Sequence, residues 1–303
     1  MKNPFQVNKI LIPIDLSDTS KLAFEHAAYL CQKFGSSLHL LHVYKTSSVD
    51  VLPNLTATSP VVSNAANLKA MVTEELDLLG KEFSDKYNVA YNIEVREGSV
   101  AKEIIETAKE VKADLIVMGT HGMSGFEEFF IGSNSYRVVT SSSIPVLTVQ
   151  QKATKMGFEN IVLPIDNSPH TRDKVSQAVA IAKTFNSKIH IAALIREENE
   201  EDQKIFNLKV RLVEEHLDHN EIQHETRVLH GENIAEMTLT FAEAVKGDLT
   251  IIMTDQENYT GFLVGPYAQR IVNHSKTPVL SVTPIGTIEG FSQDQLGGAS
   301  NPF

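Results

Sequence analysis

The amino-acid sequence predicts an α/β protein built from two tandem, doubly wound, mainly parallel five-stranded sheets. The first supporting observation is an internal duplication, since Ile10–Asp15 (ILIPID) recurs as Ile161–Asp166 (IVLPID), and later blocks of the first half recur in the same order. The second is a regular alternation of short apolar runs with segments of helical periodicity. A unit of this kind folds into a parallel sheet covered by helices.

Within each half, the predicted order is strand, helix, strand, long helical stretch, strand, helix, strand, helix, strand. The strands are continuous apolar runs, as expected when helices cover both faces of the sheet. Apolar residues at helical spacing mark the first helix of each half, at positions 24, 27, 28, 31 and 34 and at positions 175, 178, 179, 182 and 185. Gly35 and Asn186 follow, where a left-handed residue commonly ends a helix. Cys31 lies on the buried stripe, which favours packing over redox chemistry.

Three further pairs of segments complete the repeat. They are Glu97–Val100 with Gly231–Ile234, Asp114–Met118 with Asp248–Ile252, and Ile144–Val149 with Thr277–Val282. We therefore divide the chain into domains 1–150 and 151–285, with a flexible tail over 286–303. Residues 45–67, which contain Pro53 and Pro60, are expected to form a loop, and the acidic run 196–202 is expected to be a solvated loop or the start of a helix.

Composition narrows the class of protein. The formal net charge is −11, without a basic stripe, which argues against a nucleic-acid partner. No apolar run approaches the roughly 20 residues that cross a bilayer, and no signal peptide is recognisable at the start of the chain. The single cysteine excludes an intrachain disulfide. These observations predict a cytoplasmic protein without a membrane partner.

The candidate site lies in two loops after strands of the first half, because ligands of open α/β sheets bind beyond the carboxyl ends of the strands. The first loop carries Pro13, Ile14 and Asp15, and the second begins at Met118-Gly119-Thr120-His121-Gly122. Gly119 is expected to turn sharply and Gly122 to let backbone amides approach a ligand. Ile131–Ser135 then opens the last helix, over Tyr136–Ser141, where N–H groups and serine hydroxyls suit a phosphate. Two alternatives remain open: these glycines only shape turns, and Asp15 only caps a helix.

The spacing Gly119-x2-Gly122-x9-Gly132-Ser133 resembles the G-x2-G-x9-G-[ST] pattern of the ATP-binding universal stress proteins. The flanking strands, Pro13–Asp15, Leu41–Val43 and Pro145–Val149, are similar to those of the same family. The resemblance covers residues 8–150 well and residues 159–283 more weakly. It implies the Rossmann-like universal stress protein fold, in tandem form, with a first domain of the ATP-binding type.

The resemblance also implies roles for individual residues. Pro13, Ile14, Asp15 and Val43 would hold the adenine and ribose. A second group would border the ribose and phosphates: Met118, Gly119, His121 and Gly122. A third would bind the phosphates, with Mg2+ as an associated cation: Gly132, Ser133, Asn134 and Ser135. Family members pair through the last strand, so strands 145–149 and 278–282 are expected to pair within the chain as a pseudo-dimer; a true homodimer stays open.

The second half departs from the ATP-binding pattern. Met253 stands where Gly119 stood, no glycine answers to Gly122, and Gly265 is followed by Pro266, which lacks an N–H. We expect this half not to bind ATP. The whole is interpreted as a nucleotide-binding protein of stress response or signalling that acts on unidentified protein partners. The alternatives are a slow ATPase or phosphotransferase, against which the absence of a Walker A motif argues, and a scaffold without nucleotide.

Overall fold

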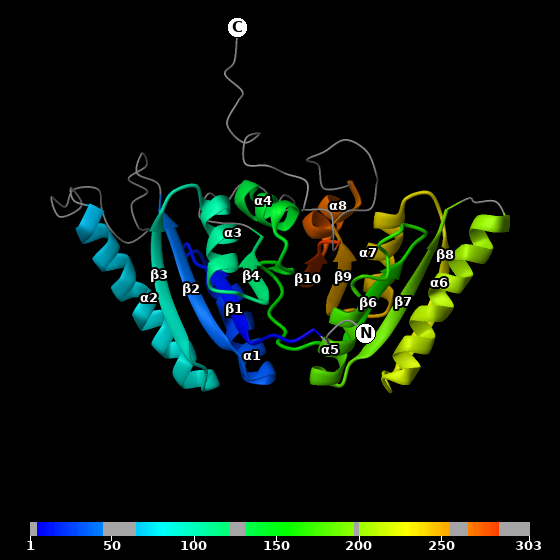
Figure 1. Cartoon of the computed structure of the whole chain (residues 1–303), viewed down its shortest axis with the longest axis horizontal. Helices are drawn as coiled ribbons and strands as arrows, with labels where there is room; N and C mark the ends of the chain where they lie inside the picture. The colour runs from blue at the N-terminus through cyan, green and yellow to red at the C-terminus, as the bar shows by residue number, and fades with distance from the viewer. Residues whose placement is uncertain (1–4, 45–64, 121–130, 197–199, 255–265, 285–303) are drawn as a thin grey trace, which may run out of the picture.

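The computed structural model describes residues 5–44, 65–120, 131–196, 200–254 and 266–284, and within them the chain forms one sheet. Figure 1 shows the two halves side by side, with the first half coloured blue to green and the second green to red. The ten strands lie in the order β3-β2-β1-β4-β5-β10-β9-β6-β7-β8. Each half contributes five consecutive strands, which is the arrangement that the duplication predicts.

The first half has five strands and four helices among its described residues. Their bounds are β1 Lys9–Pro13, α1 Asp18–Phe34, β2 Ser37–Tyr44, α2 Ala65–Tyr87, β3 Tyr91–Glu97, α3 Val100–Glu110, β4 Leu115–Gly119, α4 Ser133–Ser141 and β5 Val146–Val149. The loop expected over 45–67 is too long, because α2 already begins at Ala65; residues 45–64 lie outside the described part.

The second half repeats this order. Its elements are β6 Asn160–Ile165, α5 Val175–Phe185, β7 Lys188–Ile195, α6 Glu200–His219, β8 His224–His230, α7 Ile234–Ala244, β9 Leu249–Met253, α8 Pro266–His274 and β10 Val279–Val282. The last residues of the acidic run begin a helix, since Glu200, Glu201 and Asp202 occupy the first turn of α6. Carboxylates there interact favourably with the helix dipole.

Strand order reverses between β1 and β4. From β1 the chain moves outward through β2 to β3, and it then returns to the other side of β1 to form β4 and β5. All pairs within each half are parallel. Such a reversal leaves a crevice at the carboxyl ends of the two inner strands. The second half has the corresponding reversal between β6 and β9.

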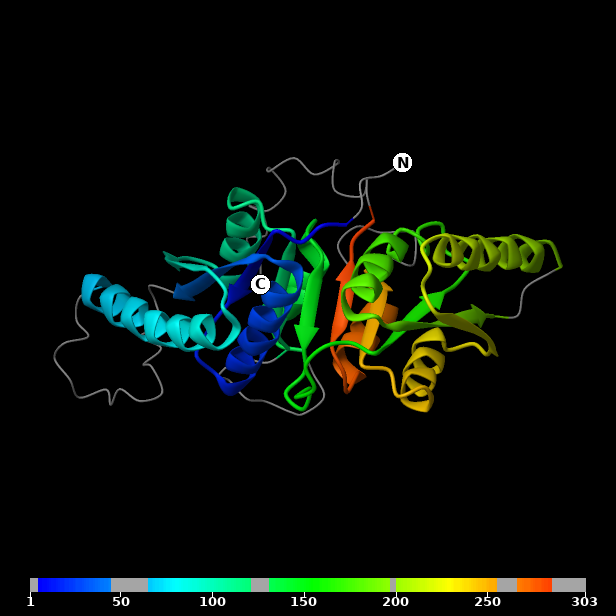
Figure 2. The same cartoon turned by 90° about the horizontal axis from the view of Figure 1, so that it is seen from below.

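The helices form a layer on each face of the sheet, as the turned view in Figure 2 shows. One apolar cluster lies under α1, α2, α5 and α6 and is continuous across both halves. The opposite face has a separate cluster in each half, one under α3 and α4 and the other under α7 and α8. The two halves therefore share one continuous core on the first face, whereas the two clusters of the opposite face are separate and only partly buried residues pack between them.

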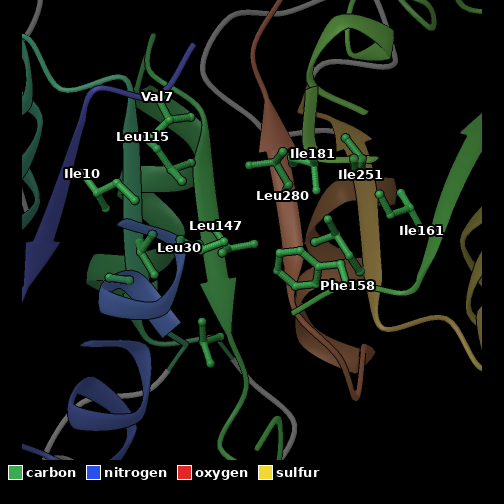
Figure 3. Packing of buried hydrophobic residues seen from close by; sticks show 14 of the residues in the cluster. Val7, Ile10, Leu30, Leu115, Leu147, Phe158, Ile161, Ile181, Ile251 and Leu280 are labelled. Atoms are coloured by element: carbon green, nitrogen blue, oxygen red, sulfur yellow. The ribbon is translucent and has the colours of Figure 1, made fainter. Parts of the chain in front are cut away.

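The halves join through β5 and β10, the only antiparallel pair among the described strands. Leu147 pairs with Leu280, its own duplicate, so the local two-fold axis passes between these two residues. Figure 3 shows both side chains on their neighbouring strands, with Phe158 and Ile181 close by in the shared cluster. The predicted intrachain pseudo-dimer is confirmed, and the pairing closes an edge that each half would otherwise expose.

Local predictions about the first helices are confirmed. Gly35 and Asn186 have left-handed backbones, with φ of 70° and 54°, and each donates its N–H to a carbonyl of the preceding helix. Cys31 is fully buried, and burial raises the pKa of its thiol, which suppresses the reactive thiolate. No helix within the described residues is long and apolar enough to cross a bilayer.

The linker between the halves is tied to α1 by a buried histidine. A ring nitrogen of His26 lies 2.7 Å from the carbonyl oxygen of Ala153 and must donate its proton to it. Burial lowers the pKa of His26 below its ordinary value of 6.5, although the carbonyl bond opposes this. The folded protein therefore holds this imidazole neutral.

We expect the free energy of unfolding to fall as the pH drops below about 6.5. Below that pH the unfolded chain binds a proton at position 26 while the folded chain still resists it, so protonation favours unfolding; above it the contribution is constant. Urea unfolding between pH 8 and pH 5.5 measures this dependence. His26→Gln, which keeps a donor for Ala153, should show a shallower dependence, and an unchanged slope would contradict the assignment. His42, whose pKa is also lowered, accounts for a residual slope.

Candidate functional site

The candidate site begins where β1 ends, at the reversal of strand order. Pro13 is the last residue of β1, and Ile14 continues the sheet by donating its N–H to the Leu41 carbonyl at 2.8 Å. Ile14 is buried, whereas Pro13 and Asp15 are half-buried. Three of the four residues expected to hold the adenine and ribose thus lie together at the carboxyl edge of the sheet.

Asp15 forms a tight turn before α1. Its Oδ1 accepts hydrogen bonds from the Ser17 N–H at 3.1 Å and the Ser17 hydroxyl at 2.6 Å. Ser17, not Asp15, is the N-cap of α1, and its hydroxyl oxygen accepts from the Ser20 N–H. Leu16 between them has φ of 65°, which is uncommon for a bulky residue and marks local strain. The alternative that Asp15 itself caps the helix is therefore wrong; Asp15 orients the residue that does.

β2 lies beside β1 and contributes Val43, which is half-buried against the apolar cluster under α3 and α4. Beside it, His42 donates from Nδ1 to the Ile14 carbonyl at 2.7 Å. Burial lowers the pKa of His42, so the ring is neutral and serves as a donor between two strand ends. His42 was not among the predicted site residues, although its position one residue before Val43 placed it beside the site.

β4 ends at Met118 and Gly119, both buried. Gly119 does not make the sharp turn expected for it, because it is the last residue of the strand and lies outside the positive-φ residues. Its lack of a side chain serves close packing instead. A Cβ at position 119 would lie 2.7 Å from the Thr19 methyl carbon and 3.1 Å from the Thr19 carbonyl oxygen. Gly119 thus lets the start of α1 approach the end of β4.

The last helix of the first half, α4, begins earlier than expected, at Ser133 rather than Tyr136, with Gly132 as its N-cap. The first intrahelical bond runs from the Tyr136 N–H to the Gly132 carbonyl. The N–H groups of residues 133 to 135 precede this bond and have no acceptor within the helix. Ser133 and Asn134 are exposed, whereas Ser135 is buried and its hydroxyl donates to the Gly119 carbonyl at 2.9 Å. Ser135 can therefore offer a ligand its N–H, while its hydroxyl joins α4 to β4.

The start of α4 differs from the start of α1, although both lie at this edge of the sheet. α1 has Asp18 in its first turn and a side-chain cap from Ser17. α4 has no acidic residue in its first turn, and its N-cap makes no side-chain hydrogen bond. In α1, Asp18 and the Ser17 cap interact with the partial positive charge of the helix N-terminus. In α4 no such side chain does, so this charge could interact with a bound anion.

Two of the expected site residues, His121 and Gly122, lie outside the described residues. The remaining ten are brought to one edge of the sheet by β1, β2, β4 and α4. Within the described residues there is no group of three or more His, Cys, Asp or Glu side chains that could hold a metal. The arrangement suits an anion at α4 and a flat, partly apolar group near Ile14 and Val43.

The corresponding edge of the second half carries different side chains. Tyr267, the duplicate of exposed Asn134, is buried and its hydroxyl lies 3.2 Å from the Thr238 hydroxyl on α7. Burial raises the pKa of Tyr267, and the Asp166 carboxylate adds to the rise. Asp166 forms the same turn as Asp15, accepting from the N–H and hydroxyl of Ser168.

A buried lysine also lies at this edge. Lys174 is fully buried just before α5, and its Nζ donates to the Thr171 carbonyl at 2.6 Å. Burial lowers the pKa of Lys174 to about 8, against the attraction of the Asp166 and Asp173 carboxylates. Its duplicate in the first half is Ala23. The second half thus places an aromatic ring and an ammonium group where the first half has small or exposed side chains.

The profile of the universal stress protein family matches residues 6–150 and again residues 157–283. The chain belongs to the universal stress protein family. Its two family matches make it a tandem universal stress protein.

A universal stress protein of Methanocaldococcus jannaschii is 36% identical to this chain over 143 residues, covering 47% of this chain and 82% of the relative. One of Bacillus subtilis is 34% identical over 147 residues, covering 47% of this chain and 99% of the relative. Among solved structures, a universal stress protein from Archaeoglobus fulgidus covers 92% of this chain and 99% of its own with a TM-score of 0.73 and 18% identity. This likeness concerns the fold of the whole tandem chain.

For this tandem universal stress protein we expect Gly119→Ala to lower the free energy of unfolding by about 1–3 kcal/mol, because the added methyl meets Thr19 in a packed core. Urea unfolding measures the loss. In the double variant, Thr19→Ser removes the methyl group nearest to the new Cβ. It should recover part of the lost stability, and not all, since the contact with the Thr19 carbonyl remains. A Gly119→Ala protein as stable as the parent would show that α1 does not need this close approach.

Proposed function

We propose that the first domain binds ATP at the carboxyl ends of β1 and β4, and that the protein acts in a cytoplasmic stress response or signalling pathway. Nucleotide binding would control its conformation and its protein partners. The observation that carries this proposal is the start of α4, a helix N-terminus without a side-chain cap or acidic residues at the reversal of strand order. Family membership supports the stress-response part.

The phosphates would lie against the first turn of α4. The N–H groups of Ser133, Asn134 and Ser135 precede the first intrahelical bond, and the Ser133 hydroxyl is exposed beside them. Donors at a helix N-terminus suit phosphate oxygens in both charge and direction. Gly132, Gly119, His121 and Gly122 belong to the same proposed phosphate and ribose region through the spacing of the sequence motif.

The adenosine would lie toward β1 and β2. Asp15 would offer a half-buried carboxylate, an acceptor that suits ribose hydroxyls, and Val43 a half-buried apolar side chain, while Ile14 and Met118 lie buried at the same edge. Pro13 completes this end of the proposed pocket. Because the described residues hold no ready-made metal cluster, Mg2+ would enter with the nucleotide and take most of its ligands from phosphate oxygens and water.

The second domain is proposed not to bind ATP. Tyr267 and Lys174 are buried at the edge where a nucleotide would lie, and Pro266 removes one N–H from the first turn of α8. The proposed stoichiometry is one ATP per chain. Calorimetric titration of the purified protein with ATP tests this number directly, and parallel measurement of released phosphate separates a binding protein from a slow ATPase or phosphotransferase.

Exchanging one residue between the domains tests the proposed site. We expect Asn134→Tyr to weaken ATP binding about tenfold or more, because it would place a bulky ring, like that of buried Tyr267, beside the N–H groups proposed to bind the phosphates. Calorimetry measures the affinity, and circular dichroism checks that the variant is folded.

The matched control is Gln269→Tyr, which adds a tyrosine to the exposed surface of α8. This variant should bind ATP like the parent. If Asn134→Tyr binds ATP as tightly as the control, the nucleotide does not lie at α4 and the proposed site is wrong. If the parent protein binds no ATP, the proposed function itself fails.

A further inference from the structure

The segment that leads into α4 is held partly by the other domain. Ile131, immediately before Gly132, donates its backbone N–H to the side-chain oxygen of Asn273 at 2.8 Å. Asn273 lies in α8 of the second domain, 142 residues away in the sequence. Figure 1 shows α4 and α8 side by side at the centre of the molecule. A residue of the domain that we propose not to bind ATP therefore contacts the residue that immediately precedes the proposed phosphate site.

Apolar packing strengthens this connection between domains. The Ile131 side chain packs against the α3–α4 cluster of its own domain and against the α7–α8 cluster of the other. Tyr136, on the first turns of α4, also packs against the α7–α8 cluster. The segment that leads into α4 thus lies across the boundary between the two domains.

Two further bonds attach this segment to β4. The Gly132 N–H donates to the Thr120 carbonyl at 2.7 Å, and the Ser135 hydroxyl donates to the Gly119 carbonyl. The N–H groups at Ile131 and Gly132 are therefore both used for attachment, one by each domain. The hydrogen bonds donated by the Ile131 and Gly132 N–H groups set the orientation of the next peptide groups, whose N–H groups would face the phosphates.

The two domains are not equivalent in this contact. The duplicate of Asn273 is Thr140, whose hydroxyl donates to the Arg137 carbonyl within its own helix. A threonine hydroxyl used in this way stabilises α4 locally. The amide oxygen of Asn273 instead reaches across the domain boundary to a backbone donor.

We propose that Asn273 is a positioning residue for the phosphate site, so that the second domain completes the binding site of the first. This inference rests on the proposed function. It assigns the second domain a role that does not require a ligand of its own: it fixes the peptide that precedes the first turn of α4. Asn273 acts on the phosphates through Ile131 and touches no ligand itself.

The test compares nucleotides with and without phosphates in the full chain. Asn273→Leu removes the acceptor at similar size and should weaken ATP binding about two- to tenfold, the range for one neutral hydrogen bond. It should leave adenosine binding unchanged, because the adenosine end of the site is formed by β1 and β2. The control Gln269→Leu makes the same amide-to-leucine change on the exposed face of α8 and should bind both ligands like the parent.

Amide hydrogen exchange without nucleotide gives a readout independent of affinity. The Ile131 N–H should exchange faster in Asn273→Leu and should stay protected in Asn273→Asp, which keeps an oxygen acceptor. Equal loss of ATP and adenosine binding, unchanged ATP affinity, or unchanged protection of Ile131 would overturn the positioning role. Binding of ATP by the parent together with any of these results would leave the proposed function intact, whereas no binding of ATP or adenosine by the parent would remove both proposals.

Discussion

The antiparallel pairing of β5 with β10 is the constraint on which the rest of the structure depends. Each half could form its own five-stranded sheet, but each would then present an edge strand to solvent. Pairing Leu147 with its duplicate Leu280 joins the two sheets and brings the apolar surfaces under α1 and α5 into one cluster. It also places α4 beside α8, since both helices are connected to these central strands. The contact between Asn273 and Ile131 is a consequence of that placement.

Duplication within one chain allowed the two edges of the sheet to diverge without changing the fold. Asp15 and Asp166 still make the same turn with the serine two residues later. The surroundings differ: Asn134 and Ala23 in the first half correspond to Tyr267 and Lys174 in the second. Tyr267 packs into the α7–α8 cluster, and Lys174 is buried near Asp166, whose attraction offsets only part of the cost of burying the ammonium group.

Much of the fold could be predicted from the sequence because its determinants are local or repeated. Gly35 and Asn186 end helices through their own backbone conformation, and the ILIPID and IVLPID segments are recognisable as buried strands wherever they lie. The candidate site, which stays a prediction, was identified from its glycine and serine spacing, which is also local. What could not be predicted depends on residues distant in sequence. Close packing against Thr19 requires a glycine at position 119, and the Ile131 N–H donates a hydrogen bond to Asn273. Neither contact produces a periodic pattern in the sequence.

Covalent connection of the two halves has a consequence for their assembly. Two separate domains that pair through edge strands dissociate on dilution, with an equilibrium set by protein concentration. Here β5 and β10 belong to one polypeptide, joined by the short segment that His26 attaches to α1, so each strand meets its partner at a high effective concentration that dilution does not change. The central sheet therefore stays intact in a cell that makes only a few copies of the protein.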